Sequence, residues 1–304
     1  MNIDLTNPIF HDEQAARKHL EATRWPDGPW CPHCGSTNAM RMKGKTQAGM
    51  FLCRDCRDKF TVRSGTVMER SHVPLAKWLL AFRLLAGAKK GMSAMQLGRT
   101  IGVTYKTAWF LGHRIRECMR DPNPAPIGGT NKVVEADESF FGGKAKNRAH
   151  RKEPPKKEAV MTLLERDGEA RSFHIADVTA KTLREALVTT ASRASYLMTD
   201  DNAAYIKVGK EYAGHGSVIH SKNEYARGGF WHVNTAECHF SLMKRSVFGS
   251  HHVISEAHLF RYLAEWDFKF NTRNISDSER TTLMVRGAEG KRLLYDQPRQ
   301  AAHA

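Results

Sequence analysis

Apolar residues recur at helical spacing in the first half of the chain, in runs at 75–87, 94–102 and 105–119. Intervals of three and four residues between apolar positions are typical of a helix with one buried face. Ser93 stands where an N-cap residue would begin the second run, and Gly102 interrupts the pattern before the third. We therefore predict a helix, a glycine-containing turn and a second, basic helix, which is a helix-turn-helix arrangement.

Shorter apolar runs of strand length follow a linker at 121–130 that is rich in proline and glycine. The first of these runs ends in carboxylates, and Asp167-Gly168 between the second and third is a hairpin signal. A helical pattern precedes the fourth run, which ends at Asp200. Three strands, a helix and another strand predict a mixed-sheet, ribonuclease-H-like α/β domain. The strand-like runs lie at 132–138, 159–166, 170–177 and 195–200, with the helix at 180–191.

Four of the six cysteines form two close pairs, and eighteen residues separate the pairs. This spacing is typical of a zinc ribbon, in which each pair contributes two thiolates to one tetrahedral Zn²⁺. Residues 40–53 alternate around a glycine-containing turn, as a hairpin would, and residues 57–68 supply another strand. The alternative, buried or redox-active thiols, does not account for both spacings. The predicted zinc ligands are Cys31, Cys34, Cys53 and Cys56.

The charge of the chain narrows the possible classes of function. Its 304 residues include 47 Lys and Arg against 32 acidic residues, a formal net charge of +15. Such an excess favours binding to polyanions, nucleic acid above all, although a solvated basic surface is the plainer alternative. No apolar run approaches the roughly 18 residues that a membrane span needs, and the first residues do not resemble a signal peptide. We expect a cytoplasmic protein without membrane contact.

The carboxylates at the strand ends indicate metal-dependent phosphoryl transfer. Two Mg²⁺ ions about 3.5–4 Å apart activate an attacking oxygen and stabilise the leaving oxygen during in-line displacement at phosphorus. Mg²⁺ prefers hard oxygen ligands, so Asp and Glu suit such a site better than His or Cys. We expect Mg²⁺, or Mn²⁺ in its place, at the catalytic site.

Several motifs together resemble the bacterial insertion-sequence transposases that join an N-terminal zinc ribbon to a DDE-type, ribonuclease-H-like catalytic domain. Each motif is weak by itself, whereas their order and spacing are specific. With the ribbon and residues 77–91 they cover nearly the whole chain. The motifs are Val134 to Glu138, Thr199-Asp200 with Tyr205, His232 to Glu237, Phe240-Ser241, Lys244-Arg245 and Arg261 to Arg273.

The resemblance implies a catalytic triad of Asp137, Asp200 and Glu237 that holds the metal ions. Thirty-six residues separate Asp200 from Glu237, consistent with the family's pattern. Asp200 is preferred to Asp201 because it directly ends the apolar run. Lys244 lies two helical turns after Glu237 on the same helix face, where a cation could bind the phosphate backbone. The neighbouring carboxylates Glu135, Glu138 and Asp201 are expected to face solvent or to support the ligands, and each of them is an alternative metal ligand.

The implied function is a DNA transposase that binds the terminal inverted repeats of its element, cleaves the ends and joins the 3′-hydroxyls to target DNA. Because an element has two ends, we expect a homo-oligomer on double-stranded DNA, associated with the nucleoid. The segment 144–157 holds seven basic residues against Glu153 and would either contact DNA or form a solvated insertion. The predicted DNA-contacting residues are Lys106, Arg114, Lys144, Lys146, Arg148, Arg151 and Lys152.

These predictions divide the chain into four regions. They are a zinc ribbon with a short N-terminal helix at 1–70, a helix-turn-helix segment at 72–121, the ribonuclease-H-like domain at 130–275 and a C-terminal tail at 276–304. Two alternative functions remain: a nuclease or resolvase of similar fold, and a zinc-ribbon DNA-binding regulator with an inactive catalytic domain. Metal-dependent strand transfer separates all three, because the nuclease would cut without joining and the regulator would do neither.

Overall fold

A computed structural model describes residues 4–44, 47–142, 157–218 and 230–294. The chain forms two compact units, one from Met1–Arg120 with Asn274–Ala304 and the other from Asp121–Arg273. The first boundary between them therefore falls at the start of the linker that is rich in proline and glycine. No helix in the described part of the chain is long and apolar enough to cross a membrane.

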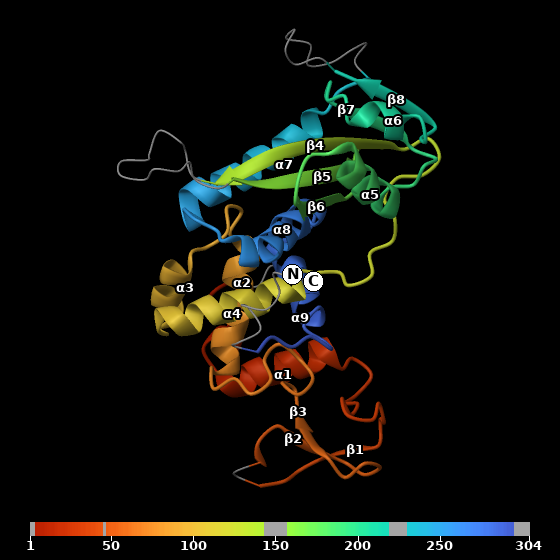
Figure 1. Cartoon of the computed structure of the whole chain (residues 1–304). Coiled ribbons are helices and arrows are strands. Elements are labelled where there is room, and N and C mark those ends of the chain that lie inside the picture. The colour runs from red at the N-terminus through yellow and green to blue at the C-terminus, as the bar shows by residue number, and fades with distance from the viewer. Residues whose placement is uncertain (1–3, 45–46, 143–156, 219–229, 295–304) are drawn as a thin grey trace. The chain divides into compact units, whose positions relative to one another are not determined.

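The first unit begins with a helix and a small antiparallel sheet (Figure 1). Helix α1 (Glu13–Arg24) is capped by Asp12, whose carboxylate accepts a backbone N–H bond of 2.6 Å. Strands β1 (Ala39–Arg41), β2 (Met50–Cys53) and β3 (Lys59–Thr61) pair in that order. The β1–β2 hairpin and the third strand agree with the predicted zinc-ribbon architecture.

Three helices follow the ribbon in the predicted helix-turn-helix order. Helix α2 (Leu75–Gly87) precedes α3 (Ala94–Ile101) and α4 (Tyr105–Cys118), and α3 packs directly against α4. Gly102 ends α3 with φ 65°, a left-handed conformation that glycine adopts without steric cost. The Thr104 hydroxyl then caps α4 by accepting a backbone N–H bond of 3.2 Å. These local signals end one helix and begin the next within three residues.

The C-terminal segment, which the sequence indicated as a tail at 276–304, contributes a helix to the first unit. Helix α9 (Asp277–Arg286) begins with a capping box and packs against α2. The Arg280 guanidinium donates a hydrogen bond to the Ala86 carbonyl at 3.1 Å, across 194 positions of sequence. Sequence periodicity carries no information about which distant helix an amphipathic segment will contact.

The second unit is built on a five-stranded mixed sheet (Figure 1). Its order is β6-β5-β4-β7-β8, with β4, β5 and β6 antiparallel and β7 and β8 parallel to β4. Asp167, at φ 62°, forms the predicted hairpin turn between β5 and β6. The edge strand β8 was not predicted, because Gly214 to Ser217 has no apolar alternation. The strands are β4 (Val133–Gly142), β5 (Lys157–Glu165), β6 (Ala170–Ile175), β7 (Tyr196–Thr199) and β8 (Gly214–Ser217).

Helices cover both faces of this sheet. One face packs against α5 (Ala180–Thr190) and α6 (Tyr205–Gly209) through a buried cluster that includes Ala136 and Leu163. The other packs against α7 (Asn234–Ser246) and α8 (Glu256–Asn271). The residues of that second interface are Phe141, Val160, Phe240, Met243, Val247, Leu259, Leu263 and Trp266. The arrangement of helices on both faces of a mixed sheet is the predicted ribonuclease-H-like fold.

Replacing Gly287 by Ala should destabilise the first unit. A Cβ at this position would lie 2.2 Å from the Cys118 carbonyl oxygen, so the backbone after α9 would have to move away from the end of α4. We expect the free energy of unfolding to fall by about 1–3 kcal/mol, measured by calorimetry of the full chain. Gly249→Ala is the matched control, because its Cβ would meet nothing within 4 Å. Equal stability of the two variants would contradict this packing.

Candidate metal centres and active site

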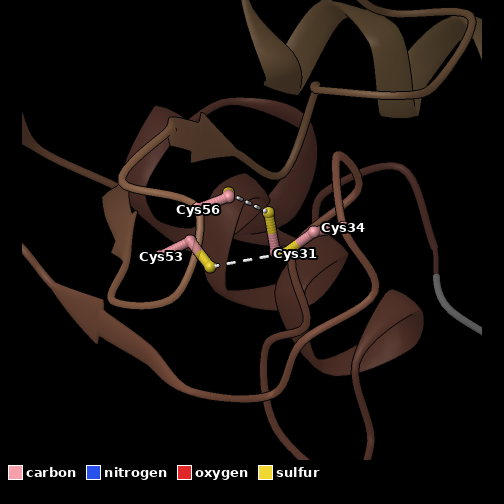
Figure 2. A group of neighbouring side chains, drawn as sticks. All are labelled: Cys31, Cys34, Cys53 and Cys56. Atoms are coloured by element: carbon pink, nitrogen blue, oxygen red, sulfur yellow. Dashed lines mark hydrogen bonds between the residues drawn. The ribbon is translucent and has the colours of Figure 1, made fainter.

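The four paired cysteines converge on one point in the ribbon (Figure 2). Their sulfur atoms all lie within 4.8 Å of one another, with 3.7 Å between Cys31 and Cys56 and 3.6 Å between Cys34 and Cys53. Cys31 and Cys53 are buried, whereas Cys34 is exposed. Four thiols at these distances fit a tetrahedral Zn²⁺, with two ligands from each turn.

The ribbon sheet has a small aromatic core, to which the residue after helix α1 contributes. Trp25 packs edge-on against Phe51 and Phe60, with ring centroids 5.4 and 5.8 Å apart. The two phenylalanine rings stack on each other at 5.4 Å. Because so small a sheet buries little apolar surface, a bound metal would contribute much of the folding free energy of this region.

The second unit brings Asp137 and Asp200 together at the end of β7. Strand β7 pairs in parallel with β4, and the last paired residues are Glu135 and Met198. Asp137 and Asp200 each follow two residues after this pair. Strand β7 stops at Thr199, whereas β4 was predicted to end at its carboxylates and instead continues to Gly142. The difference arises because β5 pairs with β4 along almost its whole length. The carboxylates therefore lie beside the end of the neighbouring strand.

Glu138 is the third carboxylate of this cluster. One oxygen each from Asp137, Glu138 and Asp200 can lie within 4.8 Å of one another, and all three residues are half-buried. The buried Tyr205 hydroxyl donates a hydrogen bond to Glu138 Oε1. Burial raises the pKa of Glu138 to about 7, and the charges of Asp200 and Asp137 add to this rise against the opposing effect of the Tyr205 bond. Three hard oxygen donors at these distances suit Mg²⁺ or Mn²⁺.

Glu135 is fully buried, so that the solvent-facing alternative for this residue is wrong. Its carboxylate accepts hydrogen bonds from the backbone amides of Thr235 and Ala236 at 2.9 and 3.1 Å, at the start of α7. The Thr235 hydroxyl and the Arg166 guanidinium each donate another bond of 3.0 Å. The strand that carries Asp137 is therefore hydrogen-bonded directly to the helix that carries Glu237.

The remaining catalytic candidates lie on α7. Glu237 is in the first turn and half-buried, and Lys244 is exposed near the end of the helix. Among the residues that the structure describes, the cluster of carboxylate oxygens contains Glu138 and does not include Glu237. Asp201, the rejected neighbour of Asp200, is exposed.

The predicted DNA-contacting residues fall into three groups. Lys106 is exposed in the first turn of α4, beside the exposed ring of Tyr105. Arg114 is only 8% exposed, and its guanidinium donates hydrogen bonds to the carbonyls of Leu293 and Glu69, both at 3.2 Å. Because these bonds hold Arg114 inside the first unit, we withdraw it as a DNA contact. Lys144, Lys146, Arg148, Arg151 and Lys152 lie outside the described residues.

Comparison with known proteins agrees with this architecture. Residues 128–271 match the family model of the ISXO2-like transposase domain, and residues 11–59 match that of the transposase zinc-ribbon domain. An uncharacterised protein in the transposable element ISH50 of Halobacterium salinarum is 28% identical over 277 residues, which are 86% of this chain and 91% of that protein. The chain therefore carries the two domains of an insertion-sequence transposase, a zinc ribbon followed by a DDE-type domain, in the order that its sequence predicts.

Removing one ribbon thiol should abolish zinc binding. We expect the purified full chain to hold about one zinc per molecule, and Cys53→Ser to hold much less, because three thiolates leave the tetrahedral site incomplete. Elemental analysis after dialysis measures the metal content. Cys238→Ser is the control, since Cys238 is an exposed thiol in the other unit. Equal zinc in both variants would contradict the four-cysteine site.

Proposed function

We propose that this transposase binds the ends of its element, cleaves them and joins the resulting 3′-hydroxyls to target DNA by metal-dependent phosphoryl transfer. The observation that carries the proposal is the meeting of Asp137 and Asp200 where β7 ends beside β4. Carboxylates in this position offer oxygen ligands on the surface of a rigid sheet, which DNA can approach.

Glu237 is proposed as the third metal ligand, on the grounds of strand geometry. Successive side chains of a strand point to opposite faces. Ala136 packs into the cluster on the α5 and α6 side, so Glu138, two residues later, shares that side with Tyr205. Glu135 and Asp137 share the other side, where α7 begins. By this alternation Asp137 belongs to the face that the helix of Glu237 covers, and one oxygen each of Asp137, Glu138 and Asp200 still lies within 4.8 Å of the others.

The proposed reaction has two chemically similar steps. In the first, water attacks the phosphodiester at the element end, which leaves a 5′-phosphate on the flanking strand and a 3′-hydroxyl on the element. In the second, that hydroxyl attacks a phosphodiester of target DNA, forms a new phosphodiester with it and releases the 3′-hydroxyl of the cut target strand. When bound, Mg²⁺ or Mn²⁺ would lower the charge on the phosphate and activate the attacking oxygen. Asp137, Asp200 and Glu237 would hold the ions, and Lys244 would bind the DNA backbone beside them. Both ends must be present together, which calls for a homo-oligomer.

DNA recognition is assigned to the first unit. The N-terminal end of the second helix in a helix-turn-helix enters the major groove. Tyr105 and Lys106 are exposed at that end, and Lys106 is proposed to contact a DNA phosphate there. A net charge of +15 supplies the general attraction to DNA. The ribbon is proposed to add contacts to the element ends.

Strand transfer tests the proposed reaction and its ligands. We expect the wild-type protein with Mg²⁺ to join a labelled fragment from beside its own gene to a plasmid. Asp137→Ala, Asp200→Ala and Glu237→Ala should each lower joining at least about 100-fold, whereas Glu138→Gln should retain most of it. Loss of joining in Glu138→Gln together with retained joining in Glu237→Ala would identify Glu138, and not Glu237, as the third ligand.

Wild-type products also separate the other functions. Cleavage without joined products would indicate a nuclease or resolvase. DNA binding with neither cleavage nor joining would indicate a regulator whose carboxylates are inactive.

Lys106→Ala should weaken binding to the element end and reduce the salt dependence of binding. One lost phosphate contact lowers the slope of log K against log salt by about 1. Gel-shift titrations at several salt concentrations measure this slope. Lys181→Ala is the control, because Lys181 is an exposed lysine on α5 in the other unit. Identical slopes for the two variants would rule out a contact at Lys106.

A further inference from the structure

We propose that Glu135 is a positioning residue that sets the start of α7, and with it Glu237, against the metal-binding strand. The proposal rests on the metal-dependent function proposed above. It assigns a role to a carboxylate that neither the metal cluster nor the DNA contacts require.

The contacts of Glu135 are those of a helix cap supplied by a distant strand. The first amides of a helix have no partner within the helix. The N-cap residue of α7 is Val233, which precedes the helix and makes no side-chain hydrogen bond to it. Glu135 replaces that cap by accepting from the Thr235 and Ala236 amides. Its negative charge also lies at the positive end of the helix dipole. A carboxylate one hundred positions away in sequence thus completes the first turn of α7.

Arg166 completes the same arrangement from the β5–β6 turn. Its guanidinium donates to Glu135 at 3.0 Å, to the Phe230 carbonyl at 3.0 Å and to the His232 carbonyl at 3.2 Å. The His232 ring also lies 3.3 Å from Glu135. The chain that enters α7 is therefore held by Glu135 and Arg166 together, which limits how far the helix can shift along the strand.

The position of Glu135 in the sequence relates this helix cap to the proposed metal ligands. It stands two residues before Asp137 on the same face of β4, and it bonds to Ala236, the residue immediately before Glu237. One buried group therefore links the segments that carry two proposed metal ligands. Partners that orient metal ligands change metal affinity by about 10–100-fold when they are lost.

A carboxylate suits this position because four groups donate hydrogen bonds to it: two amides, a hydroxyl and a guanidinium. The His232 ring nitrogen lies beside them at 3.3 Å. A glutamine would accept through one oxygen only, and its amino group would face another donor. Glu135→Gln therefore keeps the volume and removes the bonding pattern.

Metal binding tests the proposal without depending on catalysis. Mn²⁺ affinity is measured by electron paramagnetic resonance on the full chain with its ribbon loaded with zinc. We expect Glu135→Gln and Glu237→Gln each to raise the dissociation constant at least about 10-fold. The double variant should bind like Glu237→Gln alone, because Glu135 acts through Glu237. Glu165→Gln is the matched control. Its carboxylate is in the same unit and accepts a hydrogen bond from the Gly128 amide, which lies far from α7 in the sequence.

The outcomes separate a failure of the positioning role from a failure of the proposed metal site. Unchanged affinity in Glu135→Gln, or additive effects in the double variant, would overturn the positioning role while leaving the metal site intact. Unchanged affinity in Asp137→Asn would overturn the proposed metal site and the positioning role with it. Should Glu135→Gln fail to fold, Thr235→Val and Thr235→Ser replace it, since only serine keeps the hydroxyl that donates to Glu135. Weakened Mn²⁺ binding in the valine variant and recovery in the serine variant support the role, and equal binding opposes it.

Discussion

The parallel pairing of β7 with β4 is the constraint on which the catalytic unit depends. Strand β7 ends beside the middle of β4, and this leaves Asp200 next to Asp137. The pairing is itself secured by burial on both faces of β7. Leu197 packs into the cluster with α5 and α6, and Met198 packs into a separate cluster with Val133, Val218 and Val233. A shift of register by one residue would turn every side chain of β7 to the opposite face and would bury Asp200 in the apolar core. The same register of β7 against β4 is therefore needed both to bury the core residues and to place the two carboxylates together.

Adjacent carboxylates on β4 have different surroundings because a strand alternates its faces. Glu138 accepts a hydrogen bond from the buried Tyr205, and burial raises the pKa of Glu138 to about 7 against the lowering effect of that bond. Glu135 meets the amides of α7 and the Arg166 guanidinium, which supply the bonds that a buried charge needs. Asp137 lies between them with its oxygens in the carboxylate cluster. Three acidic residues within four positions of sequence therefore occupy three distinct environments.

The first unit is specified by local signals and by a C-terminal helix that packs against it. Caps at Asp12 and Thr104 and the left-handed Gly102 specify where helices begin and end. The cysteine turns bring four sulfur atoms together at a sheet that is too small to bury much apolar surface. Helix α9 then packs against α2 and contributes apolar and polar contacts from the other end of the chain.

The sequence by itself determined the features that depend on near neighbours. Cysteine spacing, helix caps, the Asp167-Gly168 hairpin and the apolar runs identified the zinc ribbon, the helix-turn-helix and the main strands. Apolar runs that end in acidic residues indicated carboxylates at two strand ends, and the family resemblance selected Asp137, Asp200 and Glu237 as the triad. Only the tertiary structure decided that β4 continues past its carboxylates, that Arg114 is buried, and that Glu135 caps α7. Each of these results depends on a partner fifteen or more residues away, and the pattern of a single segment does not specify its distant partners.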